Sequence, residues 1–222
     1  PSGMTFRQLQ ERGGWALPTE GLPSAPYRRF EKGLLRKDRR PGFETPSGKI
    51  ELYSSLREEW GLEPLPHYEE PPFTPVSQPE LAKQYPLILS SGRRSPVYFA
   101  SEHRNIPWLR QIHPHPLVEI HPETARSLGI TDGEWVWVEN WLGRCTFKAK
   151  VTPVVPEWMV MAEYGWWFPE KEGAEPGLFD VWKSNINQLI PMGYQGKDGL
   201  GAPIKNLLCR VYKVSAEDAG HD

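Results

Sequence analysis

The sequence has few cysteines and no long apolar run. Its two cysteines, Cys145 and Cys209, stand far apart and form no Cys-x-x-Cys pair, which excludes an iron–sulfur cluster or zinc site held by cysteines alone within these residues. We expect two buried thiols, with a disulfide between them as the alternative. No run of about 18 apolar residues is present, so no transmembrane helix is expected.

A large net charge is also missing. The 26 Lys and Arg residues nearly balance the 28 Asp and Glu residues, which gives a formal net charge of -2 at pH 7. This balance argues against nucleic acid or an anionic membrane as a partner, because both attract net positive charge. Any anion site must therefore be local. No signal peptide is visible, and the first residue is Pro1 rather than Met, so we expect a fragment of a longer protein.

Glycine, proline and tryptophan are abundant instead. The 20 Gly and 24 Pro residues make up about one residue in five, against a usual share of about 12%. Such a chain is rich in turns and poor in long helices. Ten tryptophans need a packed interior, because their large aromatic surfaces must be buried somewhere. The composition therefore predicts a folded, loop-rich, mainly β protein.

The first eighty residues differ from the rest and are predicted to form an N-terminal extension, residues 1–80. "MTFRQLQERGG" predicts a short helix, Lys49–Tyr53 a short strand, and Ser54–Trp60 a helix that Ser54 caps. Leu62–Pro79 holds six prolines in eighteen residues, which predicts an extended strap lying over a domain surface.

The compact part is predicted to span residues 81–214, followed by a loose tail, residues 215–222. Pro122 begins and Gly129 closes a two-turn helix, and a hairpin turns around Gly143. The predicted strands are Tyr85–Leu89, Leu117–Ile120, Trp135–Glu139, Cys145–Val151, Met159–Tyr164 and the final "LLCRVYKV". Short strands around one small helix predict a closed β-barrel.

The stretch "SSGRRSPVYFASEHRN", Ser90–Asn105, concentrates hydrogen-bond donors behind a buried strand. Gly92 allows close backbone approach, and Arg93 offers a planar, bidentate fork to a phosphate or a carbonyl. Ser101–Asn105 presents a second cluster of donors. The alternative is an ordinary loop whose charges point into water.

Two later stretches also carry donors. In "SNINQLIP", Asn185 and Asn187 offer both donors and acceptors, although asparagine here could equally cap a helix or hold a turn. In "YQGKDGLGAPIKN", Lys197 and Lys205 stand in a glycine-rich loop that lacks the spacing of a P-loop. His113, His115 and His121 are interpreted as surface or turn residues rather than metal ligands. Most of the tryptophans in "GEWVWVENW" and "YGWWF" are interpreted as packing against other domains, with the alternative that Trp166 and Trp167 border a ligand.

Several motifs resemble one family when they are taken in order. "FETPSGKIELYS", "LSSGRRSPVYFASEHRNIPWL", "LVEIHPETARSLGITDGEWVWVEN", "SNINQLI" and "GAPIKNLLCRVYKV" follow each other as in the C-terminal part of molybdopterin oxidoreductases of the dimethyl sulfoxide reductase family. The resemblance covers roughly residues 29–214 and implies a mainly β fold, a double-psi β-barrel with short helices behind an extended Pro-rich arm. Such a barrel helps to bind two molybdopterin guanine dinucleotides (bis-MGD) that chelate molybdenum or tungsten.

The resemblance also implies which residues meet the cofactor and which roles lie elsewhere. No catalytic residue and no metal ligand is expected in this segment, and many family members have a histidine where Phe99 stands. The metal's protein ligand and any 4Fe-4S cluster would lie in N-terminal domains. The implied cofactor-binding residues are Ser91, Gly92, Arg93, Ser101, Glu102, His103, Arg104, Asn185, Asn187, Lys197 and Lys205.

The implied function is two-electron redox chemistry of a larger catalytic subunit, by oxygen-atom transfer or a related reaction such as those of anaerobic respiration. "SEHRNIPWLR" is most similar to members that act on sulfur oxyanions, polysulfide or hydroxylated aromatics, with hydratase and dehydroxylase relatives. The implied partners are the remaining domains of that subunit and an iron–sulfur electron-transfer subunit, without nucleic acid or membrane insertion. Members work in the cytoplasm or the periplasm of bacteria and archaea, so the compartment stays open.

Two alternative functions would use a similar barrel. A non-redox double-psi barrel that binds a protein or peptide would have no use for the donors of Ser90–Asn105. A self-processing decarboxylase of similar fold needs a Gly-Ser bond, and the chain contains no Gly-Ser dipeptide.

Overall fold

The computed structural model describes residues 5–12, 27–93, 95–196, 201, 203–215 and 218, and for Leu9, Arg12 and Arg93 the backbone alone. The chain divides into two units, Pro1–His67 and Tyr68–Asp222. None of the helices in these described ranges has the length and apolar character needed to cross a membrane. The boundary predicted at residue 80 stays a prediction.

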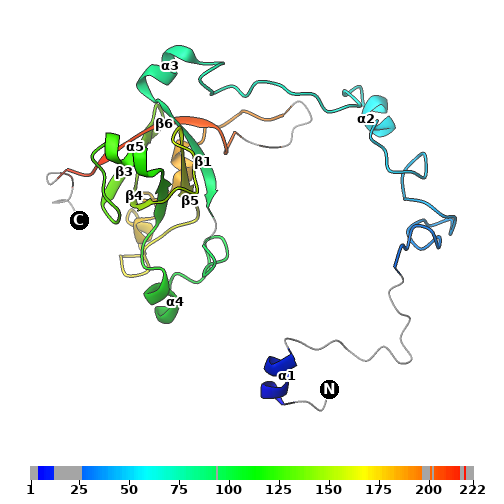
Figure 1. Ribbon diagram of the computed structural model, residues 1–222, viewed down its shortest axis with the longest axis horizontal. Coiled ribbons are helices and arrows are strands. Elements are labelled where there is room, and N and C mark those ends of the chain that lie inside the picture. The colour runs from blue at the N-terminus through cyan, green and yellow to red at the C-terminus, as the bar shows by residue number, and fades with distance from the viewer. Residues whose placement is uncertain are drawn as a thin grey trace. The chain divides into compact units, whose positions relative to one another are not determined.

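The described residues of the first unit form two short helices, α1 (Phe6–Arg12) and α2 (Ser55–Glu59) (Figure 1). The expected cap of α2 is confirmed, because the Ser54 hydroxyl accepts a hydrogen bond from the Arg57 amide. The strand expected at Lys49–Tyr53 is wrong. Its backbone finds no neighbouring strand among the described residues, and the Lys49 carbonyl instead accepts a hydrogen bond from the Thr45 hydroxyl at 2.6 Å.

The second unit is built on six strands that close into a barrel in the order β1-β5-β2-β4-β3-β6 (Figure 1). β1 pairs with β5, and β2 with β4, in parallel, while the other four pairings are antiparallel. The strands are β1 (Leu87–Arg93), β2 (Leu117–Ile120), β3 (Trp135–Asn140), β4 (Gly143–Val151), β5 (Met159–Glu163) and β6 (Leu207–Lys213). The expected fold class, a mainly β double-psi barrel with short helices, is confirmed.

Short helical segments connect these strands. Pro122 stands at the first position of its helix, as predicted, and Gly129 follows that helix with φ +67°. Strand β1 runs on to Arg93, so the donor-rich stretch begins inside a strand rather than in a loop. The helical segments are α3 (Pro79–Gln84), α4 (Pro107–Ile112), α5 (Pro122–Ser127), η1 (Leu178–Asp180) and η2 (Ile186–Leu189).

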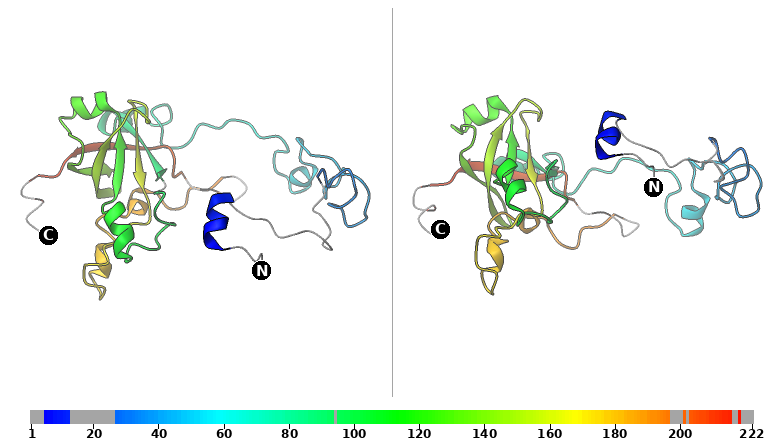
Figure 2. Two further views of the ribbon diagram at one scale, coloured as in Figure 1. Left: turned by 60° about the horizontal axis from the view of Figure 1, so that its bottom comes forward. Right: turned by 90° about the horizontal axis from the view of Figure 1, so that it is seen from below.

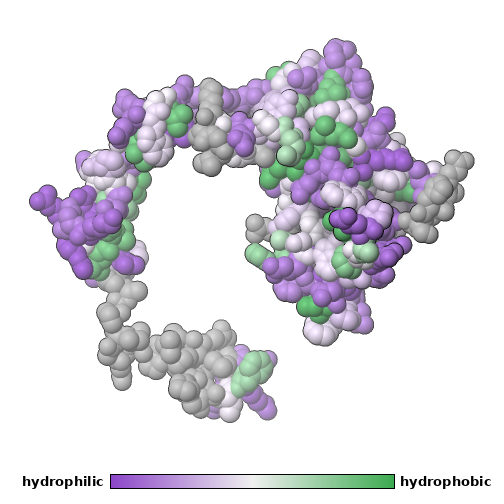
Figure 3. All heavy atoms as spheres, turned by 180° about the vertical axis from the view of Figure 1, so that it is seen from behind, coloured by the Kyte–Doolittle hydropathy of each residue, from purple (hydrophilic) through white to green (hydrophobic). Residues whose placement is uncertain are grey.

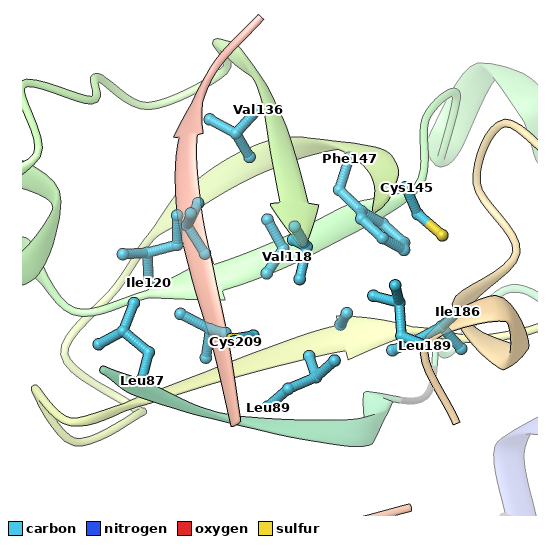
Figure 4. Packing of buried hydrophobic residues seen from close by; sticks show 14 of the residues in the cluster. Leu87, Leu89, Val118, Ile120, Val136, Cys145, Phe147, Ile186, Leu189 and Cys209 are labelled. Carbon is cyan, nitrogen blue, oxygen red and sulfur yellow. The ribbon is translucent and has the colours of Figure 1, made fainter. Parts of the chain in front are cut away.

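Alternation along the strands places the core inside the barrel (Figure 4). On β4, Cys145, Phe147 and Ala149 point inward and are buried, while Lys150 on the opposite face is exposed. Ile186 and Leu189 from η2 close one end of this core, and Phe73 from the proline-rich segment joins it. The ring of Phe73 lies 4.8 Å from that of Trp141, so this part of the predicted strap is anchored by an aromatic contact.

The two cysteines are buried free thiols, as expected, and no disulfide joins them. Burial raises the pKa of Cys145 to about 12 and raises the pKa of Cys209 still further. Because only the thiolate reacts quickly, we expect no labelling by dithionitrobenzoate at pH 8 over minutes in the native chain, and labelling of both thiols in urea. Rapid labelling of the native chain would contradict this packing.

Candidate cofactor-binding end of the barrel

Strand direction brings the predicted stretches to one end of the barrel. The parallel strands β1 and β5 both end there. β6 runs antiparallel to β1, and β2 runs antiparallel to β5, so both begin there. β4 is parallel to β2 and therefore begins there too. η2 lies at the same end, held by hydrogen bonds from Cys145 Sγ to the Asn185 carbonyl (3.1 Å) and from Asn140 Nδ2 to the Leu189 carbonyl (2.7 Å). We call this the η2 end. Figure 2 shows α4 and the yellow segment that contains η1 on this side, away from α5.

The end of β1 meets the segment that leads into β6. The amide of Ser91 donates to the carbonyl of Ile204 at 2.9 Å, and the ammonium of Lys205 donates to the Ser91 carbonyl. Gly92 has φ +121°, and a Cβ there would lie 2.0 Å from Lys205 Nζ. The positive φ favours glycine at this position, and a Cβ would push the ammonium of the flexible Lys205 side chain out of its place. The structure brings Ser91, Gly92 and Lys205 together, while the side chain of Arg93 lies outside the described residues.

The second predicted cluster forms a tight loop at the same end. Ala100 and His103 both have positive φ, 44° and 71°, a conformation that costs L-residues energy and that concentrates at functional sites. Ser101, Glu102 and His103 are exposed. The Ser101 carbonyl accepts a hydrogen bond from Trp167 Nε1 at 2.6 Å, which ties the loop to the segment after β5.

Arg104 holds this loop from the inside. It is 2% exposed, and its Nη1 donates to the carbonyls of Ala100 and Glu102 while its Nη2 donates to that of Tyr164 at 3.4 Å. Its guanidinium lies 4.6 Å from the ring centre of Tyr98 and 5.1 Å from that of Trp166. Burial lowers the pKa of Arg104 from its usual value. Most of its donors are thus used on the backbone.

A buried carboxylate lies beside Arg104. Glu163, at the end of β5, is 2% exposed, accepts a hydrogen bond from the Leu117 amide at 3.2 Å, and pairs with Nε2 of His113 at 2.9 Å. Arg104 and Glu163 line one cavity of 220 Å³ together with Ser95, Tyr98, Phe99, Ala100 and Tyr164. Buried charges are tolerated where they are paired, so we interpret Arg104, Glu163 and His113 as a structural polar cluster of the η2 end.

The two asparagines of "SNINQLIP" have different environments. The side-chain oxygen of Asn185 accepts a hydrogen bond from the Asn187 amide at 3.1 Å and caps η2, so the structural alternative weighed for Asn185 is present. The Asn187 side chain is exposed. Lys197 lies outside the described residues.

Two residues are more buried than the sequence-based interpretation allows. His113, interpreted as a surface or turn residue, follows α4 but is only 9% exposed, and its ring pairs with Glu163. Trp166 is an exception to the interpretation that most of these tryptophans pack against other domains, because it is 1% exposed and packs with Tyr98 and Phe168 of its own unit. Sequence reasoning missed Glu163 and Tyr98. One signal was available: Glu163 ends the apolar strand "MVMAE", and a charge in that place needs a partner.

Comparison with known proteins identifies the class. Residues 87–195 match the family described as "Molydopterin dinucleotide binding domain". The chain therefore contains a molybdopterin dinucleotide-binding domain, and its homologues belong to the dimethyl sulfoxide reductase family, as the motif order indicated. Those homologues include oxidoreductases and a hydratase.

The individual proteins that this chain is similar to are named for different reactions. A dopamine dehydroxylase of Eggerthella lenta is 35% identical over 239 aligned residues, covering 96% of this chain and 23% of the relative. An acetylene hydratase of Syntrophotalea acetylenica is 48% identical over 132 residues, covering 60% of this chain and 18% of the relative. The solved acetylene hydratase from Pelobacter acetylenicus superposes with a TM-score of 0.72 at 34% identity, covering 96% of this chain and 28% of that one. The chain thus spans between 18% and 28% of the length of these relatives.

The donors at the η2 end fit a molybdopterin cofactor chemically. A pterin dinucleotide presents phosphates, carbonyl groups and amide-like edges, which need cationic and neutral donors together with close backbone approach. The Lys205 ammonium, the hydroxyl of Ser91 and the Cβ-free backbone of Gly92 supply these. Within the described ranges, no group of three His, Cys, Asp or Glu side chains could hold a metal ion.

Proposed function

We propose that the η2 end binds and orients molybdopterin guanine dinucleotide within the catalytic subunit of a molybdenum or tungsten oxidoreductase. The observation that carries this proposal is the convergence of Ser91, Gly92, Lys205 and the loop of residues 100–104 at one end of a barrel that belongs to a cofactor-binding family. The proposed contacts are the eleven predicted residues, Ser91, Gly92, Arg93, Ser101, Glu102, His103, Arg104, Asn185, Asn187, Lys197 and Lys205.

The residues divide the work of holding this ligand. Lys205 offers charge to a phosphate or a ring oxygen next to the bare backbone of Gly92. Arg104 keeps the loop in its positive-φ conformation, so that the exposed Ser101 and His103 face a ligand without rearranging. The bound cofactor, as bis-MGD, would supply the two-electron chemistry at molybdenum or tungsten.

The whole protein would be larger than this chain. We propose that the barrel is the C-terminal part of a subunit whose other domains complete the site, with an iron–sulfur subunit as electron partner. Oxygen-atom transfer or a related hydration or dehydroxylation fits the names of the dopamine dehydroxylase and acetylene hydratase relatives. The exposed apolar side chains on the barrel, among them Phe99, Trp108 and Met192, are consistent with neighbours of this kind; Figure 3 shows apolar surface interrupting the hydrophilic surface.

The test is a calorimetric titration of the 222-residue chain with GDP and with purified molybdopterin guanine dinucleotide. We expect saturable binding of the dinucleotide that weakens at least about 10-fold in Lys205→Met, since one charged hydrogen bond contributes roughly 1.5–3 kcal/mol. Gly92→Ala should weaken it at least as much, because its Cβ displaces the Lys205 ammonium. Lys83→Met, which removes an exposed lysine of α3 paired with Glu80, is the matched control and should bind normally.

A second measurement uses the larger subunit that contains the chain. The GMP released by acid hydrolysis counts the guanine dinucleotide in the purified enzyme, and we expect Gly92→Ala to lower that content while Lys83→Met leaves it unchanged. A folded Gly92→Ala enzyme with full cofactor content would refute the assignment. A folded chain that captures a protein through this end, without binding either nucleotide, would support a peptide-binding module instead.

A further inference from the structure

A second cavity lies on the outside of the barrel and shares none of its lining residues with the eleven proposed cofactor contacts. Its volume is 560 Å³, and the outward-facing residues of β3 and β4 form much of its wall. Trp135 and Trp137 alternate with the buried Val136 and Val138, so both indoles point out of the barrel. The lining residues are Glu134, Trp135, Trp137, Arg144, Thr146, Phe168, Lys183, Lys213, Val214 and Asp218. We call it the outer groove.

The walls of the outer groove combine aromatic rings with cations. The Arg144 guanidinium lies 4.0 Å from the ring centre of Trp137, and Lys148 Nζ lies 5.9 Å from that of Trp135. Thr146 donates to the Lys183 carbonyl at 3.2 Å, which fixes Lys183 over β4. Lys213 pairs with Glu134 at 3.0 Å. Cations therefore outnumber carboxylates among the chain's own residues around the groove.

A carboxylate already lies in this groove. Asp218 accepts hydrogen bonds from Trp137 Nε1 and from Arg144 Nη2, both at 3.3 Å. Ser215 also holds this carboxylate, since its hydroxyl donates at 2.9 Å to Asp218 Oδ2, the oxygen that accepts from Trp137. These bonds, with the Ser215 hydroxyl first, lower the pKa of Asp218. The chain reaches the groove directly from β6, because the Val214 amide donates to the Trp135 carbonyl at 3.0 Å.

We propose that the outer groove is a docking site for an acidic peptide segment, and that the residues of this chain around Asp218 are its occupant. The sequence "SAEDAGHD", residues 215–222, contains three acidic residues, and three cations, Arg144, Lys183 and Lys213, line the groove, so the segment and the groove are complementary in charge. Trp137 and Arg144 bind a carboxylate through one indole N–H and one guanidinium N–H. The indole rings of Trp135 and Trp137 contact the apolar part of the peptide. This docking site does not involve the cofactor, so its test does not depend on whether the proposed function is correct.

The test follows the indole N–H resonance of Trp137 by NMR in the full chain, assigned with Trp137→Phe. In Asp218→Ala we expect this resonance to move, because its hydrogen-bond acceptor is gone. Adding the synthetic peptide Ac-SAEDAGHD-NH2 in trans to Asp218→Ala should move it back in a saturable way, with weaker binding at high salt. The peptide Ac-SAEAAGHD-NH2, which lacks the central aspartate, should bind up to about fivefold more weakly, since an exposed charged pair contributes up to about 1 kcal/mol.

Paired arginine variants complete the test. Arg144→Met in the Asp218→Ala background should abolish the response to Ac-SAEDAGHD-NH2, whereas Arg210→Met should leave it intact. The two arginines are matched: their side chains are 45% and 50% exposed, and each pairs with one carboxylate, Asp218 for Arg144 and Glu139 for Arg210. An unmoved Trp137 resonance in Asp218→Ala, or equal binding of the two peptides, would overturn the proposal.

Discussion

Glu163→Gln is expected to destabilise the barrel unit by about 3 kcal/mol, because it removes the negative charge from a buried cluster of three charged or polar side chains. The amide keeps the shape of Glu163, so the loss reports charge rather than packing. His113 would lose its carboxylate partner, and the 2%-exposed Arg104 would lose the carboxylate that stabilises its charged form. The measurement is urea unfolding of the full chain, followed by circular dichroism.

Glu170→Gln is the matched control for this loss. Glu170 also pairs with a basic residue, Arg110 at 2.7 Å, but its side chain is 53% exposed. Surface pairs contribute about 0–1 kcal/mol, so we expect a change below about 1 kcal/mol. Similar losses in the two variants would show that burial of the Glu163–His113 pair does not matter for stability.

Arg104→Met is expected to cost about 2–4 kcal/mol and to loosen residues 99–105 selectively. The methionine fills part of the space but donates to none of the Ala100, Glu102 and Tyr164 carbonyls. Two residues of this loop have positive φ, and that conformation persists only while its surroundings hold it. Amide hydrogen exchange should therefore rise in residues 99–105 more than in β3 and β4.

Arg104→Lys distinguishes the contribution of the positive charge from that of the planar guanidinium with its directed hydrogen bonds. A lysine keeps a positive charge but has one ammonium and no planar face to stack on Tyr98 and Trp166. We expect it to recover less than half of the lost stability. Arg126→Met, which removes an arginine that is 70% exposed, should change stability by less than about 0.5 kcal/mol. Full recovery by lysine would mean that charge alone, rather than the directed hydrogen bonds, holds the loop.

Much of the barrel was predictable from local patterns. The alternation of Cys145, Phe147 and Ala149 with polar residues, and the turn at Gly143, were enough to place β3 and β4 as a hairpin. Pro122 marked the start of α5 for a purely local reason, its missing N–H. The false strand at Lys49–Tyr53 has the same origin, since a local pattern cannot report whether a partner strand exists.

The candidate site was predictable only in part. The glycine requirement at residue 92 and the donor-rich character of the stretch were visible in the sequence. The contact of Lys205 with Ser91 joins residues 114 apart, and the pair of His113 and Glu163 joins residues 50 apart. No spacing rule reaches across such distances. The interpretation of His113 as a surface or turn residue therefore misses its burial.

By itself, the sequence determined the class of fold, most of the strand positions and the family, because alternation, turn residues and motif order are local properties of the chain. Only the tertiary structure decided which donors meet at the η2 end, that Arg104 is directed inward to its own loop, and that Asp218 lies against Trp137 and Arg144. The physical reason is the closure of the barrel. Parallel pairing of β1 with β5 and of β2 with β4 brings distant segments to one end, and that pairing is set by the packed core rather than by any single segment.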